Sequence, residues 1–239
     1  MKILAVIPAK GESKGCPGKN TANLCGKPVI CYTIDYAHES GVSYVVSTDS
    51  DKIAKICRDY GSPVVMRPAE LAKDDTRIDY VLRHAVETVE GDGGRYDIII
   101  LLYACVPIRE AGLIETALDR FEMGNDSVRS YARVDSNQHP DRQFRMIQHN
   151  GAYTPYQITH DNTYRRQDLD TPAKRVYYHD GGLVAMTRDA LFGAKKSGNF
   201  SYLGEHRSAI IVKHPTVDID SPMDLLLAET ILCRGLMSY

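Results

Sequence analysis

The first twenty residues decide the fold that we expect: Met1-Lys-Ile-Leu-Ala-Val-Ile-Pro8, followed by Ala9-Lys-Gly-Glu-Ser-Lys-Gly-Cys-Pro-Gly-Lys-Asn20. They read as a buried apolar strand that runs directly into a glycine-rich loop containing Lys10, Lys14 and Lys19. Glycines let the backbone approach a ligand closely, and lysines supply positive charge for phosphate oxygens. Because ligands of α/β proteins bind at the carboxyl ends of strands, this order predicts a phosphate-binding loop. A surface loop with solvated lysines is the alternative.

The loop matches neither of the two common phosphate-binding patterns. A Walker A loop has four residues between its glycines and a Ser or Thr after Gly-Lys, but here Asn20 follows Gly18-Lys19. Gly11, Gly15 and Gly18 do not have the Gly-x-Gly-x-x-Gly spacing of dinucleotide-binding proteins either. The sequence therefore predicts a phosphate site of another class.

Length, charge and cysteine content narrow the class of protein. A chain of 239 residues with a formal net charge of −2 fits one α/β domain without general affinity for nucleic acid or anionic membranes. It has neither an apolar run of about 20 residues nor the organisation of a signal peptide, so we expect no membrane insertion. The six cysteines form no Cys-x-x-Cys pair, so we expect neither zinc nor a disulfide framework. These features predict a cytoplasmic enzyme.

Short apolar strands alternate with helical patterns through the first half of the chain. The nearly continuous apolar runs at 3–7 and 98–102 are typical of central strands that are buried on both faces of a parallel sheet. The alternation predicts a doubly wound, three-layer α/β fold with a mostly parallel sheet. The expected strands are 2–7, 43–48, 63–66, 97–103, 176–186 and 209–213, and the expected helices are 28–39, 50–60, 76–90, 111–123 and 222–234.

Residues 127–178 are rich in arginine and tyrosine and lack helical periodicity. His139-Pro140-Asp141 and Asn150-Gly151 are turn signals, so we expect hairpins and loops that leave the main sheet. Arginine and tyrosine are enriched at protein interfaces, and arginine also binds anions. We therefore expect one domain, 1–239, in which 127–178 form a small protruding dimerisation lobe that closes over the active site. A merely solvated excursion is the alternative.

Two aspartates, Asp218 and Asp220, lie just before the last expected helix. In an extended segment, residues two apart point to the same side, so both carboxylates can bind one divalent cation. Mg²⁺ prefers one or two carboxylates combined with phosphate oxygens. An isolated Asp-x-Asp is usually a turn or a cap, but together with a phosphate-binding loop this pair predicts a metal–nucleotide site.

Several short stretches, taken together, are characteristic of one family. They are Ile7-Pro-Ala-Lys10, Lys14-Gly-Cys-Pro-Gly-Lys-Asn20, Gly26-Lys-Pro28, Val46-Ser-Thr-Asp49, Arg67-Pro-Ala-Glu-Leu-Ala72, Pro107-Ile-Arg109, Arg166-Gln-Asp168, Val217-Asp-Ile-Asp220 and Ala228-Glu229. On these stretches the chain resembles the acylneuraminate cytidylyltransferases, which make CMP-sialic acid and related CMP-nonulosonates. The resemblance implies a Rossmann-like nucleotidyltransferase fold and a homodimer. It also implies Mg²⁺-dependent transfer of CMP from CTP to the hydroxyl of an acidic sugar, with release of pyrophosphate.

Carried over position by position, the resemblance implies roles at the nucleotide. Lys10 and Lys19 would hold the triphosphate, and Arg67 with the backbone around Thr76 would read the base. Asp218 and Asp220 would hold Mg²⁺, and one of them would orient or deprotonate the attacking hydroxyl. Pro8, Ala9, Lys14 and Asn20 complete the expected nucleotide site, and Lys10, Lys19 and Asp220 are the expected catalytic residues.

On the acceptor side, the resemblance places Arg142, Arg166 and Gln167 near the sugar, in or close to a neighbouring subunit. The chain also departs from the family pattern there. Tyr103 replaces a glutamine that is expected beside the sugar, and Asp180 replaces an asparagine, so we expect both at the acceptor. Lys10 replaces an arginine, which keeps the charge but loses the bidentate fork. Nucleotidyl transfer is therefore better supported than sialic acid as the acceptor.

Other interpretations stay open at this point. One is a related nucleotidyltransferase that uses a sugar phosphate, a phosphonate or another base, and a second is a non-catalytic nucleotide-binding relative. A glycosyltransferase also combines a nucleotide site with Asp-x-Asp. Its acidic pair normally follows a central strand near the middle of the chain, however, unlike the pair at 218–220.

Overall fold

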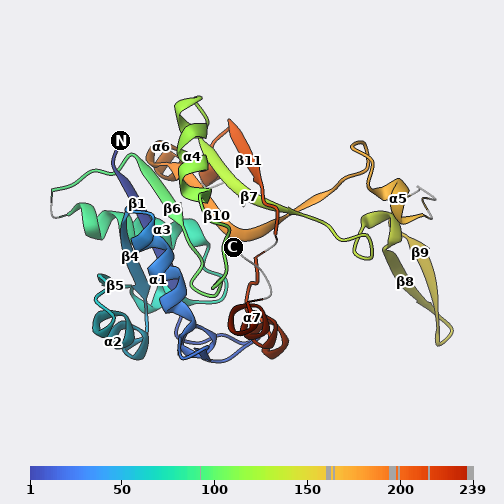
Figure 1. The fold of residues 1–239 in the computed structure, drawn as a ribbon, viewed down its shortest axis with the longest axis horizontal. Coiled ribbons are helices and arrows are strands. Elements are labelled where there is room, and N and C mark those ends of the chain that lie inside the picture. The colour runs from blue at the N-terminus through green and yellow to red at the C-terminus, as the bar shows by residue number, and fades with distance from the viewer. Residues whose placement is uncertain are drawn as a thin grey trace. The chain divides into compact units, whose positions relative to one another are not determined.

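The computed structural model describes residues 1–91, 93–159, 163, 165–193, 198, 200–214 and 216–235. It divides into two compact units, which we call the main unit and the inserted unit (Figure 1). The main unit comprises Met1–Tyr131 and Asp180–Tyr239, and the inserted unit comprises Ala132–His179.

The main unit is built on a seven-stranded sheet with the order β11-β7-β10-β6-β1-β4-β5. Strand β1 pairs in parallel with both β4 and β6, as does β4 with β5 and β7 with β11, whereas β10 runs antiparallel to β6. The expected doubly wound, mostly parallel α/β fold is thus confirmed. The strands are β1 (Ile3–Ala9), β4 (Ser43–Thr48), β5 (Val64–Met66), β6 (Ile98–Leu101), β7 (Ser127–Arg133), β10 (Tyr177–Thr187) and β11 (Arg207–Ile211).

The apolar run of β1 makes it the centre of the sheet. Leu4 and Val6 pack with Leu82 of α3 (Ile78–Glu90), while α1 (Val29–Glu39) also lies against β1 and β4 (Figure 1). Ala5 and Ile7, which point to the face opposite Leu4 and Val6, are fully buried as well. Both faces of β1 are therefore covered, and its carboxyl end opens directly into the glycine-rich loop.

Helices α2 (Asp51–Asp59) and α7 (Pro222–Arg234) begin at residues whose side chains cap them. Ser50 caps α2 by accepting a hydrogen bond from the Ile53 N–H. Ser221 and Asp224 form a capping box at the start of α7, which confirms the expected start of this helix. None of the helices in the described ranges is long and apolar enough to cross a membrane. The other elements are α4 (Leu113–Glu122), α6 (Arg188–Gly193), β2 (Asn23–Leu24), β3 (Lys27–Pro28) and the 3₁₀ helices Lys19–Thr21, Ala69–Ala72 and Ser201–Leu203.

Strand β7 was not expected, and the prediction that residues leave the main sheet from 127 onward is wrong for this stretch. Val128, Ser130 and Ala132 are buried at alternate positions, while Arg129 and Tyr131 are only partly buried. The strand therefore buries every second residue. One of these buried residues is a serine, so the sequence does not show the alternation of apolar and polar residues by which a strand is recognised.

The inserted unit contains an antiparallel hairpin of β8 (Phe144–His149) and β9 (Ala152–Gln157). Asn150 and Gly151 join the strands with φ angles of 47° and 80°, which is why this turn uses an Asn-Gly pair. The hairpin is accompanied by the 3₁₀ helix Pro140–Arg142 and the short helix α5 (Arg166–Leu169). Its strands are exposed along almost their whole length within this unit.

A disulfide joins Cys25, just after β2, to Cys233 in α7, with the two Cα atoms 5.9 Å apart. This bond corrects the prediction that the chain contains no disulfide. The two cysteines are 208 residues apart in sequence, so no local spacing could reveal the pair. Cys16, Cys31, Cys57 and Cys105 are free thiols.

Candidate nucleotide-binding and catalytic site

A cavity of about 350 Å³ lies where β1 ends and the glycine-rich loop begins. Several other lining residues were not expected at the site, among them Asp74 and Cys105. Ala9 is fully buried in β1 and is not among the lining residues. The residues that were expected at the site and that line this cavity are Pro8, Lys10, Lys14, Lys19, Asn20, Arg67, Thr76 and Tyr103.

The two ends of the chain meet beside this cavity. Lys19 Nζ donates a hydrogen bond to Asp220 Oδ1 at 2.6 Å, and the Lys19 side chain is only 13% exposed. Burial alone would lower the pKa of Lys19, but the hydrogen bond to Asp220 and the charges of Asp220 and Asp218 act in the opposite direction, and the pKa is raised. A Cβ at Gly15 would lie 2.7 Å from the Asp220 carbonyl oxygen, so this close approach requires glycine.

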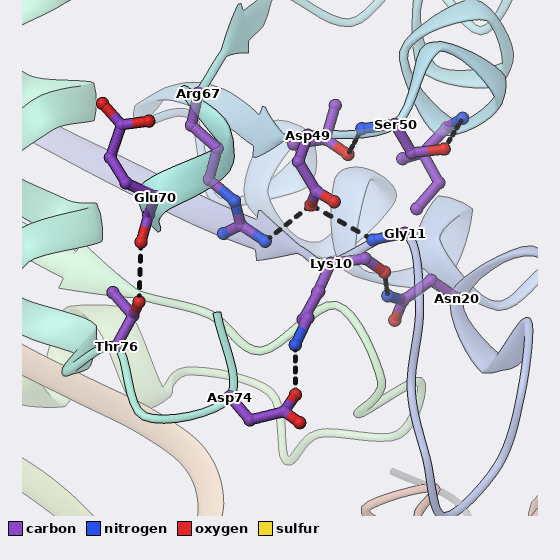
Figure 2. A network of polar contacts seen from close by, with 11 residues as sticks. Lys10, Gly11, Asn20, Asp49, Ser50, Arg67, Glu70, Asp74 and Thr76 are labelled. Carbon is purple, nitrogen blue, oxygen red and sulfur yellow. Dashed lines mark hydrogen bonds and ion pairs between the residues drawn. The ribbon is translucent and has the colours of Figure 1, made fainter. Parts of the chain in front are cut away.

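Asp74 binds both lysines at the mouth of the cavity. Lys10 Nζ pairs with one carboxylate oxygen (Figure 2). Lys14 Nζ lies 2.5 Å from the other oxygen. Hydrogen bonds from these two lysines lower the pKa of Asp74 to about 2. One carboxylate thus pairs with two of the three lysines that are expected to bind phosphate. Sequence reasoning missed Asp74, because a single aspartate in a loop carries no signal of its own.

Asp49 connects the glycine-rich loop to the expected base-reading residue. Its Oδ1 accepts from Arg67 Nη2 at 2.9 Å and from the Gly11 N–H at 3.2 Å (Figure 2). Arg67 is only 7% exposed, so Asp49 both compensates a buried charge and fixes its direction. The sequence contained Asp49 in the stretch that resembles the family, but nothing in the spacing suggested this role.

Two buried polar atoms beside the cavity have no hydrogen-bond partner among the described residues: Arg67 Nε and Asn20 Oδ1. The amide nitrogen of Asn20 donates to the Lys10 carbonyl at 3.0 Å, which fixes the direction of the side chain. Buried polar groups are normally paired, so a donor and an acceptor without partners indicate a ligand with complementary groups.

Thr76 and its neighbours form the opposite wall. The Thr76 hydroxyl donates to the Glu70 carbonyl at 3.0 Å (Figure 2). The Thr76 N–H donates to the Lys73 carbonyl at 3.2 Å. Leu71, Ile78 and Val81 add an apolar surface to the same cavity. A cationic loop facing an apolar wall suits a ligand with phosphates at one end and a ring at the other.

Asp218 is held by a contact of its own, with Cys105. Burial raises the pKa of Asp218. Cys105 Sγ donates a hydrogen bond of 2.9 Å to Asp218 Oδ1, and this bond partly offsets the rise. Burial raises the pKa of Cys105 itself to about 12, which keeps this thiol protonated at neutral pH. The described residues contain no cluster of three or more His, Cys, Asp or Glu placed to hold a metal. A pair of carboxylates fits Mg²⁺ when phosphate oxygens supply further ligands.

The expected acceptor residues fall into different surroundings. Burial raises the pKa of Tyr103 to about 12 at the cavity wall. Asp180 is 6% exposed, accepts from the Ser130 hydroxyl and the Gly182 N–H, and lies in the sheet rather than among the lining residues of the cavity. Within the inserted unit, Arg142, Arg166 and Gln167 line a cavity of about 770 Å³.

Comparison with known proteins identifies the family. A family model described as Cytidylyltransferase matches residues 4–186. The N-acylneuraminate cytidylyltransferase of Streptococcus agalactiae serotype III is 31% identical over 234 residues, which cover 95% of this chain but 52% of that protein. The chain therefore spans about half the length of this relative. The pseudaminic acid cytidylyltransferase of Campylobacter jejuni is 29% identical over 235 residues, covering 96% of this chain and 95% of that protein.

Solved structures agree in fold. A CMP:2-keto-3-deoxy-manno-octonic acid synthetase complexed with CTP matches with a TM-score of 0.69, covering 99% of this chain and 100% of that chain. At 19% sequence identity this match concerns the fold alone. The family match extends over most of the sheet and includes the glycine-rich loop. The chain belongs to the cytidylyltransferase family.

Proposed function

We propose that this protein transfers CMP from CTP to the hydroxyl of an acidic sugar of the nonulosonic-acid type and releases pyrophosphate. The observation that carries the proposal is the ion pair between Lys19 and Asp220, because it joins the expected phosphate-binding loop, whose Lys19 lines the cavity, to the acidic pair expected to bind the metal. The names of the two relatives support CTP as donor and a sugar acid as acceptor. We assign the reaction to the cytoplasm, where CTP is available.

The nucleotide occupies the cavity with its phosphates toward the lysines. Lys10, Lys14 and Lys19 neutralise the triphosphate, after Asp74 has released the first two. Arg67 Nε donates to the nucleoside and Asn20 Oδ1 accepts from it, which gives both buried atoms a partner. The apolar wall around Thr76 covers the base.

Asp218 and Asp220 would hold Mg²⁺ together with phosphate oxygens. When bound, Mg²⁺ neutralises charge on the phosphates and polarises the phosphorus that is attacked. The acceptor hydroxyl oxygen forms a bond to the α-phosphorus, while the bond from that phosphorus to the bridging oxygen of pyrophosphate breaks. The hydroxyl proton passes to a carboxylate of the pair, and Lys19 stabilises the negative charge on the departing pyrophosphate.

A matrix of nucleoside triphosphates and acceptors tests this proposal. Each triphosphate is incubated with Mg²⁺ and with a nonulosonic acid, a sugar phosphate or a phosphonate, and pyrophosphate release is followed along with the CMP-sugar signal in ³¹P NMR. We expect release only with CTP and a sugar acid, and release at least tenfold slower with the Lys19→Ala variant as the matched control. Preference for GTP or UTP, or release that needs no acceptor, would contradict the assignment.

We further propose that the inserted unit pairs with a second copy of the chain. A two-stranded hairpin is marginally stable alone, yet β8 and β9 expose large apolar side chains within this unit: Phe144 (51%), Met146 (58%) and Tyr153 (66%). An identical hairpin would cover these side chains. In this assembly Arg142, Arg166 and Gln167 serve the acceptor, as the resemblance implies.

Sedimentation equilibrium tests the dimer. Met146→Glu places a charge on the exposed apolar strand and should shift the protein from dimer to monomer. Lys52→Glu, an exposed substitution in α2, is the control and should leave the dimer intact. A monomeric wild-type protein at micromolar concentration would refute this part of the proposal.

A further inference from the structure

Cys105 makes two separate contacts with the segment that carries the acidic pair. Its thiol donates to Asp218 Oδ1 at 2.9 Å, and its carbonyl oxygen accepts from the Ile219 N–H at 3.0 Å. Cys105 lies in the loop that follows β6, and through these two bonds it contacts the adjacent residues Asp218 and Ile219. Cys105 is also a lining residue of the cavity that contains Lys19.

The surroundings explain why a side-chain contact matters here. Ile219 is fully buried and Val217 is 7% exposed, so the backbone of the segment is anchored in the core on either side of Asp218. The carboxylate of Asp218 is not fixed by this anchoring, because rotation about its side-chain bonds remains. Among the described residues, the Cys105 thiol is the donor that the structure gives this carboxylate.

We propose that Cys105 is a positioning residue that orients Asp218 for the divalent cation. Hydrogen bonds to the ligands of a metal fix their orientation, and their loss commonly weakens metal binding by about 10–100-fold. The thiol acts through Asp218 rather than as a third ligand, since Mg²⁺ selects oxygen over sulfur. This inference rests on the proposed function, because it assumes that Asp218 binds the cation of the CTP complex.

Manganese binding gives a readout that does not depend on turnover. Mn²⁺ is titrated into the full-length protein with saturating CTP and no acceptor, and free Mn²⁺ is measured by electron paramagnetic resonance after subtraction of the Mn²⁺ bound by CTP alone. We expect Cys105→Ala to raise the dissociation constant of Mn²⁺ about tenfold. Cys105→Ser, which keeps a donor, should stay within about threefold of wild type.

Two controls separate orientation from general damage. Cys57→Ala removes a buried thiol in α2, away from the cavity, and should leave the Mn²⁺ dissociation constant unchanged. Thermal unfolding of each variant, together with metal-free CTP binding, should match wild type, since the Ile219 N–H still bonds to the backbone carbonyl of residue 105.

The possible outcomes are distinct. Unchanged Mn²⁺ affinity in Cys105→Ala refutes the positioning role, and equal losses in Cys105→Ala and Cys105→Ser refute the hydrogen bond as its cause. If the wild-type protein binds no Mn²⁺ with CTP, the proposed function fails and this inference fails with it. If the wild type binds Mn²⁺ and CTP but uses no sugar acid, the acceptor assignment fails, while the variants still decide the role of Cys105.

Discussion

Lys19 Nζ lies 2.6 Å from Asp220 Oδ1, although 201 residues separate the two in sequence. The contact joins the acidic segment to a lysine of the glycine-rich loop that lines the cavity. It also compensates the charge of Lys19, whose side chain is only 13% exposed.

Removal of either partner of this pair should abolish most of the activity. Lys19→Ala and Asp220→Asn are each expected to lower kcat at least tenfold, because a charge that stabilises the transition state is lost. Steady-state pyrophosphate release measures this, and circular dichroism checks that the fold is intact. Lys55→Ala, in the exposed ion pair with Asp59 on α2, is the control. Near-normal rates in the first two variants would show that the reaction takes place elsewhere.

Asp74 should compete with CTP for Lys10 and Lys14. Asp74→Asn frees both lysines, so CTP is expected to bind about two- to fivefold more tightly, in line with the small energies of exposed ion pairs. Isothermal titration with CTP, without acceptor, measures the effect. Asp75→Asn changes the exposed neighbouring carboxylate and should have a smaller effect. Weaker CTP binding in Asp74→Asn would mean that this carboxylate contributes to the bound state.

Tyr103 should affect the acceptor more than the nucleotide. The Tyr103→Gln variant restores the residue of the family pattern, so we expect the KM of the sugar acid to change at least threefold, on the order of one lost or gained hydrogen bond. The KM of CTP should change less than twofold. Both constants come from the same pyrophosphate assay. An unchanged KM for the acceptor would remove Tyr103 from the acceptor pocket.

The Cys25–Cys233 disulfide should contribute strongly to stability. Closing a loop of 208 residues reduces the entropy of the unfolded chain, which corresponds to about 5 kcal/mol in the chain-entropy description. Dithiothreitol should therefore lower the free energy of unfolding measured in urea. The double variant Cys25→Ser/Cys233→Ser should be as unstable as the reduced protein and insensitive to dithiothreitol. Equal stability with and without reductant would contradict the bond.

Acid should weaken the ion pair between Glu90 at the end of α3 and Arg188 at the start of α6. Hydrogen bonding from Arg188 lowers the pKa of Glu90 below its ordinary value of 4.5, and the two side chains meet at 2.8 Å. Because the pKa is lower in the folded state, the stabilisation is complete above pH 4.5 and is lost as the pH falls through the lowered pKa. Glu90→Gln should remove about 1 kcal/mol at pH 7 and less at pH 3. A loss that is equal at both pH values would contradict this linkage.

The sequence predicted the central sheet because its strands are physically distinct. β1 and β6 are continuous apolar runs, and only a strand covered on both faces has that composition in an α/β protein. β7 escaped prediction because Ser127, Arg129 and Ser130 resemble a polar loop, and its partners β10 and β11 come much later in the chain. Local pattern cannot reveal pairing that is set by distant strands.

The sequence also indicated part of the candidate site, namely the residues that belong to a local pattern. Glycines and lysines next to a strand indicated a phosphate loop, and the spacing of Asp218 and Asp220 indicated a cation pair. Asp49, Asp74 and Cys105 were not assigned because each acts through a contact with a residue far away in sequence. Asp180 shows the opposite case, since a residue chosen by resemblance lies buried in the sheet beside Ser130.

The strands that lead into and out of the inserted unit, β7 and β10, are neighbours in the main sheet. The two chain ends at which residues 132–179 are attached therefore arise from adjacent positions, as in a hairpin. A short turn could bridge them without shifting any strand of the sheet. The inserted unit can therefore change in length and in amino-acid sequence, by evolution or by design, while the sheet and the glycine-rich loop of the main unit keep their structure.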